Sequence, residues 1–198
     1  MTPPRGAATV GSGDLTAWRR RLTAGLAGTV VEIGAGTGGN LGHLDPTLRW
    51  VGVEPDRHRA ALLRRAARER FRDAAVLRCG AEAVPVPDGS ADAVLSTLAL
   101  CSVRDQHRAL HEVRRVLRPG GVLRLLEHVA APRGTWTRLA QHVVAPCSVL
   151  LDHGCHPARD TEAALLGAGF VPVELERFRL PGALGTWVDH VAGEAEVA

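Results

Sequence analysis

Three glycines at alternate positions, Gly34, Gly36 and Gly38, follow directly on the run 30–33, which is rich in β-branched residues. Residues without side chains let the backbone approach a ligand closely, and a helix that starts after them can hold an anionic or polar group. Twenty positions after Gly34, Glu54 ends a second apolar run at 50–53. A carboxylate in that place can accept two hydrogen bonds from a ribose diol. This spacing predicts a nucleotide-binding turn between a strand and a helix.

The glycine spacing alone leaves two classes of ligand open. Gly34, Gly36 and Gly38 fit the G-x-G-x-G spacing of S-adenosylmethionine (SAM) sites, whereas Gly34, Gly36 and Gly39 fit the G-x-G-x-x-G spacing of dinucleotide sites. Glu32 favours SAM, because its carboxylate attracts the cationic amino and sulfonium groups of SAM and would repel a pyrophosphate. A purely structural turn is the third interpretation. We take SAM as the predicted ligand.

The elements that must position this turn alternate between β-branched runs and segments with helical spacing of apolar residues. We predict strands at residues 29–33, 50–53, 75–78, 91–96, 122–127, 170–177 and 187–197. We predict helices at residues 15–28, 38–44, 57–71, 105–117 and 161–169. This alternation predicts an α/β fold: one Rossmann-like, doubly wound sheet of about seven strands, mostly parallel, with an antiparallel last strand and a helical cover.

The chain length of 198 residues suits one domain. Residues 1–14 are rich in proline, glycine and small side chains, which predicts a mobile tail before a domain at 15–198. Within that domain, the pattern changes at 133–159 to helix-like segments that carry histidine and cysteine. We predict that this insertion covers the pocket of the second substrate.

The order of motifs resembles the class I SAM-dependent methyltransferases over nearly the whole chain after residue 28. The matching segments are 32–38, 80–82, 92–98 and 113–121. Within that family, the segments 97–103, 127–131 and 154–156 are similar to the methyltransferase-like-seven group, whose members are alkyl thiol methyltransferases. The resemblance implies an enzyme that methylates the sulfur of a hydrophobic small molecule. Methylation of oxygen, nitrogen or carbon in a small metabolite is the alternative.

The resemblance also implies which residues bind the cofactor. The turn 34–38 should hold the methionine end, with Glu32 supporting it, and Glu54 should bind the ribose. The loop 80–82 should frame the adenine, although this chain has Ala81 where the family has a first acidic residue. The full predicted set is Glu32, Gly34, Ala35, Gly36, Thr37, Gly38, Asn40, Glu54, Pro55, Gly80, Ala81, Glu82, Thr97 and Leu98.

On the acceptor side, His128 is the candidate general base because it follows the fifth predicted strand at the ligand-binding edge. A thiol needs a base less than a hydroxyl does, since its ordinary pKa is near 8.5. The predicted acceptor-binding residues are Cys101, His142, His153 and His156. The spacing of ligand types at 152–156 matches no zinc motif, so no metal is predicted.

Composition limits the other classes of function. All 24 basic residues are arginines spread along the chain, and there is no tyrosine, so no nucleic-acid surface is expected. No apolar run reaches the roughly 20 residues of a membrane span, and residues 1–14 lack signal-peptide order, so we predict a cytoplasmic protein without a membrane span. The oligomeric state stays open. Two rival classes remain, a non-catalytic SAM-binding module and an NAD-dependent oxidoreductase.

Overall fold

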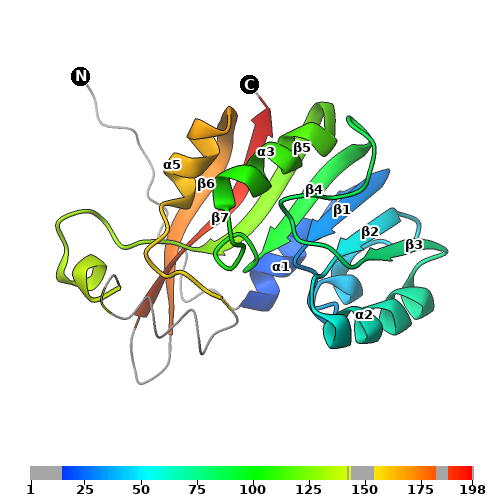
Figure 1. The fold of residues 1–198 in the computed structure, drawn as a ribbon, viewed down its shortest axis with the longest axis horizontal. Helices are drawn as coiled ribbons and strands as arrows, with labels where there is room; N and C mark the ends of the chain where they lie inside the picture. The colour runs from blue at the N-terminus through cyan, green and yellow to red at the C-terminus, as the bar shows by residue number, and fades with distance from the viewer. Residues whose placement is uncertain (1–14, 142, 144–153, 182–186, 198) are drawn as a thin grey trace.

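The computed structural model describes residues 15–141, 143, 154–181 and 187–197. Within these residues, seven strands form one sheet in the order β3-β2-β1-β4-β5-β7-β6 (Figure 1). The strands are β1 (Thr29–Ile33), β2 (Arg49–Val53), β3 (Asp73–Leu77), β4 (Ala91–Thr97), β5 (Leu117–His128), β6 (Phe170–Pro181) and β7 (Trp187–Val197). The pairs among β1 to β5 are parallel, and β7 runs antiparallel to both β5 and β6. The predicted fold class is therefore confirmed, including the antiparallel last strand.

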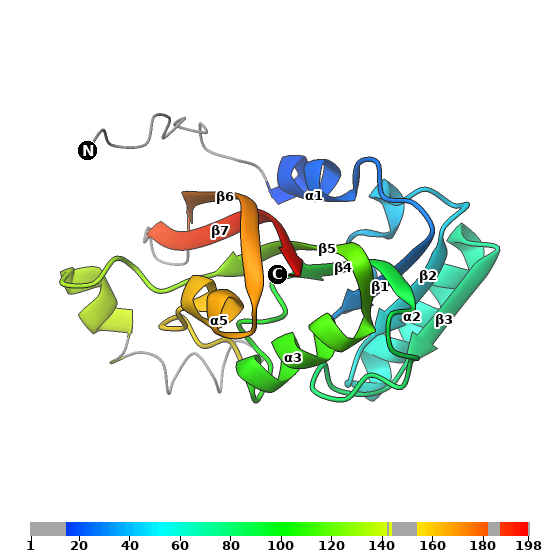
Figure 2. The same ribbon diagram turned by 90° about the horizontal axis from the view of Figure 1, so that it is seen from above.

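Helices cover both faces of this sheet. They are α1 (Leu15–Thr23), α2 (Arg57–Arg70), α3 (Gln106–Val116) and α5 (Thr161–Gly167). Because side chains alternate along a strand, Val30 packs in one core with residues of α1 and α2, and Val31 packs in another with residues of α3 and α5. Figure 2 shows α1 on the opposite side of the sheet from α3 and α5. Burial on both faces explains why most residues of the central strands β1 and β4 are buried and apolar.

The crevice for a ligand follows from the strand order. The chain proceeds from β1 outward to β2 and β3, and then returns to place β4 on the other side of β1. The loops after β1 and β4 therefore leave the sheet in diverging directions, which opens a crevice at the carboxyl ends of these strands. The glycine turn follows β1 and residues 98–102 follow β4, so both reach this crevice.

One predicted helix does not form, and another is shorter than predicted. The helix predicted at 38–44 is wrong, because only a 3-10 turn at Leu41–His43 forms there. Gly34, Gly36 and Gly38 all have positive φ, so the chain stays out of helical geometry through the turn. The helix predicted at 15–28 ends at Thr23, ahead of Gly25 with φ of +70°. β6 in turn continues to Pro181, beyond the predicted end at 177.

The predicted cover at 133–159 lies partly outside the described residues, at 142 and 144–153. In the described part, residues 136–141 are helical and stand away from the sheet, at the end of the molecule opposite β3 (Figures 1 and 2). The division into a tail at 1–14, a domain and an acceptor cover stays a prediction. Across the described residues, no helix combines the length and the apolarity that crossing a membrane requires.

Candidate functional site

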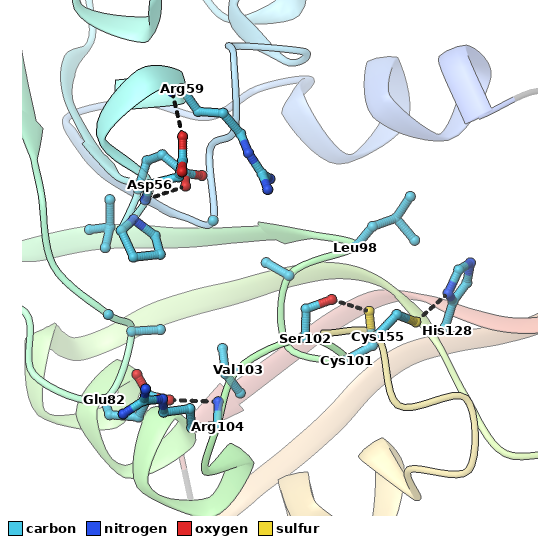
Figure 3. Close-up of a pocket in the computed structure, with 17 residues that line it drawn as sticks. Asp56, Arg59, Glu82, Leu98, Cys101, Ser102, Val103, Arg104, His128 and Cys155 are labelled. Carbon is cyan, nitrogen blue, oxygen red and sulfur yellow. Dashed lines mark hydrogen bonds between the residues drawn. The ribbon is translucent and has the colours of Figure 1, made fainter. Parts of the chain in front are cut away.

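A cavity of about 640 Å³ lies at the carboxyl ends of the central strands (Figure 3). This volume falls within the range typical of small-molecule sites. The loops that follow β1, β2, β3 and β4 and the last residue of β5 all contribute to its wall. The residues that line it are Gly34, Val53, Glu54, Pro55, Asp56, Arg59, Gly80, Ala81, Glu82, Leu98, Ala99, Cys101, Ser102, Val103, Arg104, His128 and Cys155.

The glycine turn has left-handed backbone geometry at the positions where ligand and protein approach it. Gly34 and Gly36 both have φ of +60°. A methyl group added to Gly34 would overlap the side chain of Ala99, whereas one added to Gly36 would meet no protein atom within 4 Å. Gly34 is therefore required by packing within the protein. Gly36 leaves an open space that a ligand can enter.

Glu54 joins the glycine turn to the start of α2. Its side chain is buried, with 3% of the residue exposed. The backbone N–H of Gly36 donates to Glu54 Oε2 at 3.0 Å, and that of Asp56 donates to Oε1 at 2.9 Å. Each carboxylate oxygen has a second lone pair, so Glu54 can hold the turn and still accept hydrogen bonds from a ligand.

Glu32 lies beneath the glycine turn and is fully enclosed by protein. Asn40 Nδ2 donates to Glu32 Oε1 at 2.8 Å, and Trp50 Nε1 donates to Oε2 at 3.0 Å. Asn40 Nδ2 also donates to Thr97 Oγ1 at 2.7 Å. Burial raises the pKa of Glu32 to about 7. Neither Glu32 nor Asn40 is among the residues that line the large cavity, so their place in the structure is to brace the turn from behind.

A second hollow of about 260 Å³ lies beside the glycine turn. Its wall includes the predicted cofactor residues Ala35, Thr37 and Thr97 together with Arg19 of α1 and Arg59 of α2. Arg19 Nη1 also donates to Asn40 Oδ1 at 2.8 Å. Sequence analysis missed both arginines, because they lie on helices outside the motifs that predicted the cofactor site. Their positive charges suit a carboxylate next to the turn.

The loop after β3 supplies the far end of the cavity. Gly80, Ala81 and Glu82 all line it. Glu82 Oε1 accepts hydrogen bonds from the backbone N–H groups of Arg104 at 2.8 Å and Asp105 at 3.2 Å. Glu82 thereby fixes the start of α3 against this loop, as Figure 3 shows for Arg104.

The loop after β4 is held in a strained conformation. Leu98 has φ of 55° and is the one non-glycine residue with positive φ among the described residues. Its backbone N–H donates to the carbonyl of Leu126 at 2.7 Å, which ties the loop to β5. Such strain persists where surrounding structure fixes the backbone, and it is common at ligand sites. Here it places Leu98 on the wall of the cavity.

Glu127 is the buried anchor of this loop, and sequence analysis missed it. Its Oε1 accepts from Ser96 Oγ at 2.5 Å and from the backbone N–H groups of Ala99 and Leu100, both at 3.1 Å. Its Oε2 accepts from the backbone N–H of Cys101 at 3.1 Å. Burial raises the pKa of Glu127, and these hydrogen bonds oppose that rise. The signal in the sequence that could have identified Glu127 is a carboxylate one residue before the end of a mostly apolar strand.

Three residues capable of sulfur or imidazole chemistry meet at the other end of the cavity, which Figure 3 shows. His128 Nδ1 lies 3.1 Å from Cys155 Sγ, and Cys101 Sγ lies 3.6 Å from Ser102 Oγ. A hydrogen bond with Cys155, together with burial, raises the pKa of Cys101 well above its ordinary value. His190 packs edge-on against His128 with ring centroids 4.4 Å apart. Burial lowers the pKa of His190 to about 4, so it is neutral at pH 7.

The predicted acceptor residues are only partly brought together. Cys101 and the predicted base His128 line the same cavity. His156 is not among the lining residues; its backbone N–H donates to the carbonyl of Cys101 at 2.9 Å. His142 and His153 lie outside the described residues. Cys155, which was not predicted as an acceptor residue, also lines this cavity.

Comparison with known proteins decides the family of this chain. A family model described as a methyltransferase domain matches residues 31–125. The human thiol S-methyltransferase TMT1A is 37% identical over 174 residues, which cover 84% of this chain and 70% of the relative. The chain belongs to the SAM-dependent methyltransferases. The human thiol S-methyltransferase TMT1B is also 37% identical, over 86% of this chain and 72% of its own length.

Solved structures of low sequence identity share the fold of this methyltransferase. The geranyl diphosphate C-methyltransferase of Streptomyces coelicolor A3(2), solved with S-adenosyl-L-homocysteine, superposes with a TM-score of 0.72 at 19% identity. That match covers 93% of this chain and 79% of the other. The YcgJ protein of Bacillus subtilis gives a TM-score of 0.72 at 16% identity, over 90% and 96% of the two chains.

The cofactor of this methyltransferase is S-adenosylmethionine. The residues present fit it. The open space over Gly36 leaves room against the backbone, and Glu54 retains lone pairs toward the cavity. At 640 Å³, the cavity can also take a small acceptor beside a nucleoside.

Proposed function

We propose that this methyltransferase transfers the methyl group of SAM to the sulfur of a small hydrophobic thiol. The observation that carries the proposal is the continuity of one cavity from Glu54 and the loop 80–82 to Leu98, Ala99 and the sulfur-bearing end. Relatives that are 37% identical over most of the chain are named thiol S-methyltransferases, which supports sulfur as the acceptor atom.

In this proposal, each part of the cavity has one task. Glu54 accepts hydrogen bonds from the ribose, the loop 80–82 frames the adenine, and the glycine turn holds the methionine end with Arg19 and Arg59 near its carboxylate. Leu98 and Thr97 lie next to the sulfonium. The apolar wall of Leu98, Ala99 and Val103 contacts the acceptor.

SAM supplies a methyl group bound to a cationic sulfonium, and its transfer is an in-line displacement. The protein therefore has to align the two reactants and exclude water. A few per cent of an ordinary thiol is ionised at neutral pH, so a general base is less important than for a hydroxyl. His128, at the acceptor end of the cavity, is the residue best placed to assist the loss of a proton.

The test is a pooled assay with isotope-labelled SAM against alkyl and aryl thiols, phenols, amines and carboxylates. We expect a hydrophobic thiol to be methylated fastest. A phenol or alcohol methylated faster than every thiol would overturn the choice of sulfur. SAM binding with no methylated product from any acceptor would instead support a non-catalytic binding module.

We also propose a cytoplasmic location. Cys79, Cys101 and Cys155 are thiols and not disulfides in the structure, which suits a reducing compartment. Fractionation of the native host, followed by immunodetection of the protein, tests this location. Recovery of the protein in an oxidising compartment would contradict it.

A further inference from the structure

Cys101, His128 and Cys155, here called the sulfur–imidazole cluster, combine three ligand types that bind soft and borderline metal ions. The two sulfur atoms and an imidazole nitrogen lie within 4.8 Å of one another. Cys101 and Cys155 are buried, and His128 is half-buried on the cavity wall. The three residues come from the loop after β4, the end of β5 and the segment before α5, so no sequence motif predicts that they meet.

Their spacing is close to that of a zinc site. With Zn–S bonds of about 2.3 Å and Zn–N bonds of about 2.0 Å, tetrahedral ligand atoms stand about 3.5 to 3.8 Å apart. A side-chain adjustment of about 1 Å brings separations of up to 4.8 Å to that value. Two thiolates and one imidazole also balance the charge of Zn²⁺, which matters because a buried charge has to be compensated.

The backbone around the cluster is fixed by contacts that do not use its ligand atoms. The side chain of Glu127 accepts a hydrogen bond from the backbone N–H of Cys101. The backbone carbonyl of Cys101 accepts one from the backbone N–H of His156 at 2.9 Å. Arg159 Nη1 donates to the carbonyl of Leu100 at 2.6 Å. Metal sites are built in this way, with outer contacts that hold the ligands in place.

Gly154 allows the closest approach of the segments that carry the two cysteines. It has φ of +91°, and an added methyl group would stand 3.1 Å from the carbonyl oxygen of Ser102. The chain therefore passes tightly against residue 102 just before Cys155. This approach places both sulfur atoms at the end of the cavity next to Leu98.

We propose that the sulfur–imidazole cluster binds one Zn²⁺ ion through Cys101, His128 and Cys155, and that the open fourth coordination position receives the acceptor thiol as a thiolate. Three protein ligands with an open position are the arrangement of catalytic rather than structural zinc. The second part of this proposal rests on the proposed thiol methyltransferase function. It makes His128 a metal ligand in place of a general base.

The bond changes balance without a further reactant. The acceptor loses its S–H proton to solvent water, and the electron pair left on sulfur forms the bond to Zn²⁺. Methylation then joins the methyl carbon to that sulfur, while the broken C–S bond leaves its electron pair on the sulfur of the donor. The product is a neutral thioether, a weaker ligand than a thiolate, so it dissociates from the metal.

Direct metal binding tests the site without reference to activity. Co²⁺ titrated into reduced, metal-free protein should give a 1:1 complex with thiolate-to-cobalt charge-transfer bands and the visible bands of tetrahedral cobalt, and Zn²⁺ should displace it. Cys101→Ser, Cys155→Ser and His128→Ala should each weaken metal binding by about 100-fold or more. Cys79→Ser is the matched control, since Cys79 is half-buried but outside the cluster, and it should bind cobalt like the parent.

SAM affinity, measured by calorimetry, shows which variants are folded. If a cysteine variant does not fold, mass spectrometry of the parent protein replaces it: Zn²⁺ should protect Cys101 and Cys155, but not Cys79, from alkylation by iodoacetamide. Absence of cobalt bands in protein that binds SAM would overturn the site. The site would also be overturned if Zn²⁺ left the extent of alkylation unchanged at each of the three thiols.

The fourth position is tested with butanethiol and butanol added to the cobalt form. We expect butanethiol to shift the cobalt bands and butanol to leave them unchanged. An unchanged spectrum with both would overturn the open position. The two proposals fail separately: a protein that binds cobalt but methylates no thiol would contradict the proposed function, and one that methylates thiols without binding metal would contradict this inference.

Discussion

Glu54 shows how one side chain can serve the fold and the ligand together. Its two oxygens hold the backbone of Gly36 in the glycine turn and the backbone of Asp56 at the start of α2. The remaining lone pairs are directed by that same geometry, so the ribose-binding group is already oriented before a ligand arrives. Pre-orientation of this kind reduces the entropy that binding has to offset.

Replacing Glu54 by alanine should weaken SAM binding by about 1.5 to 3 kcal/mol, the range for hydrogen bonds to a charged group. Calorimetric titration of SAM measures the change. Glu69→Ala, an exposed carboxylate in α2, is the control and should bind like the parent. A dissociation constant that is the same for Glu54→Ala and Glu69→Ala would contradict the assignment.

Gly36 and Gly34 allow a matched comparison, because both have φ of +60° but different surroundings. Alanine at either position costs about 1 to 2 kcal/mol of stability in left-handed geometry. Gly34→Ala should lose about 1 to 3 kcal/mol more through overlap with Ala99. Gly36→Ala should lose only the ~1 to 2 kcal/mol of stability that the left-handed geometry costs. It should nevertheless bind SAM at least about tenfold more weakly, which corresponds to about 1.4 kcal/mol of binding free energy.

Urea unfolding and calorimetry together check this pair of glycines. Gly42→Ala is the control, since an added methyl there meets no atom within 4 Å and its φ is not left-handed. We expect that control to bind SAM like the parent. Equal SAM affinity in Gly36→Ala and Gly42→Ala would show that no ligand approaches the space over Gly36.

At the scale of elements, the loop after β4 depends on the neighbouring strand β5. The carboxylate of Glu127 in β5 accepts three hydrogen bonds from the backbone N–H groups of residues 99–101. Leu98, held at positive φ, donates its own N–H to β5. The acceptor end of the cavity is thus built by strand pairing, and the loop has little freedom of its own.

Glu127→Gln should reduce stability by about 1 to 3 kcal/mol, because the amide NH₂ group would face a buried backbone N–H and leave it without an acceptor. Displacement of the loop should also lower kcat for the methylated acceptor while SAM affinity stays near that of the parent. Urea unfolding and steady-state kinetics measure the two effects. Glu174→Gln, on an exposed carboxylate of β6, should change neither, and a similar result for both variants would contradict the role of Glu127.

At the scale of the whole molecule, the buried Glu32 links folding to pH. Its pKa is about 7 in the folded protein and near 4.5 when exposed. The folded state therefore keeps a proton that the unfolded state has lost between these values, and Glu32 costs stability as the pH rises through this window. The difference corresponds to about 3 kcal/mol.

Glu32→Gln removes this titration. We expect the variant to gain about 3 kcal/mol relative to the parent between pH 4.5 and pH 7, whatever the offset between them at pH 4.5. Urea unfolding of both proteins across this range measures the difference, in which other titrating groups such as His190 cancel. A difference that does not change with pH would mean that Glu32 is ionised throughout.

The sequence by itself determined the α/β class and the glycine turn, because both depend on local patterns: apolar periodicity, missing side chains and the spacing of Glu54 from Gly34. The glycines alone left SAM and a dinucleotide open, and Glu32 together with the family resemblance favoured SAM. The sequence also pointed to sulfur chemistry through resemblance. It did not predict the 3-10 turn at 41–43, since three glycines with positive φ at alternate positions override the helical spacing.

Only the tertiary structure decided which distant side chains meet. Glu127 as the anchor of the loop, Arg19 beside the glycine turn and the meeting of Cys101, His128 and Cys155 all join segments that are far apart in sequence. The contacts between Glu127 or His128 and the loop after β4 result from the strand order, which places the ends of β4 and β5 side by side. Spacing along the chain carries no information about such pairs, because their separation is set by how the sheet is wound and packed.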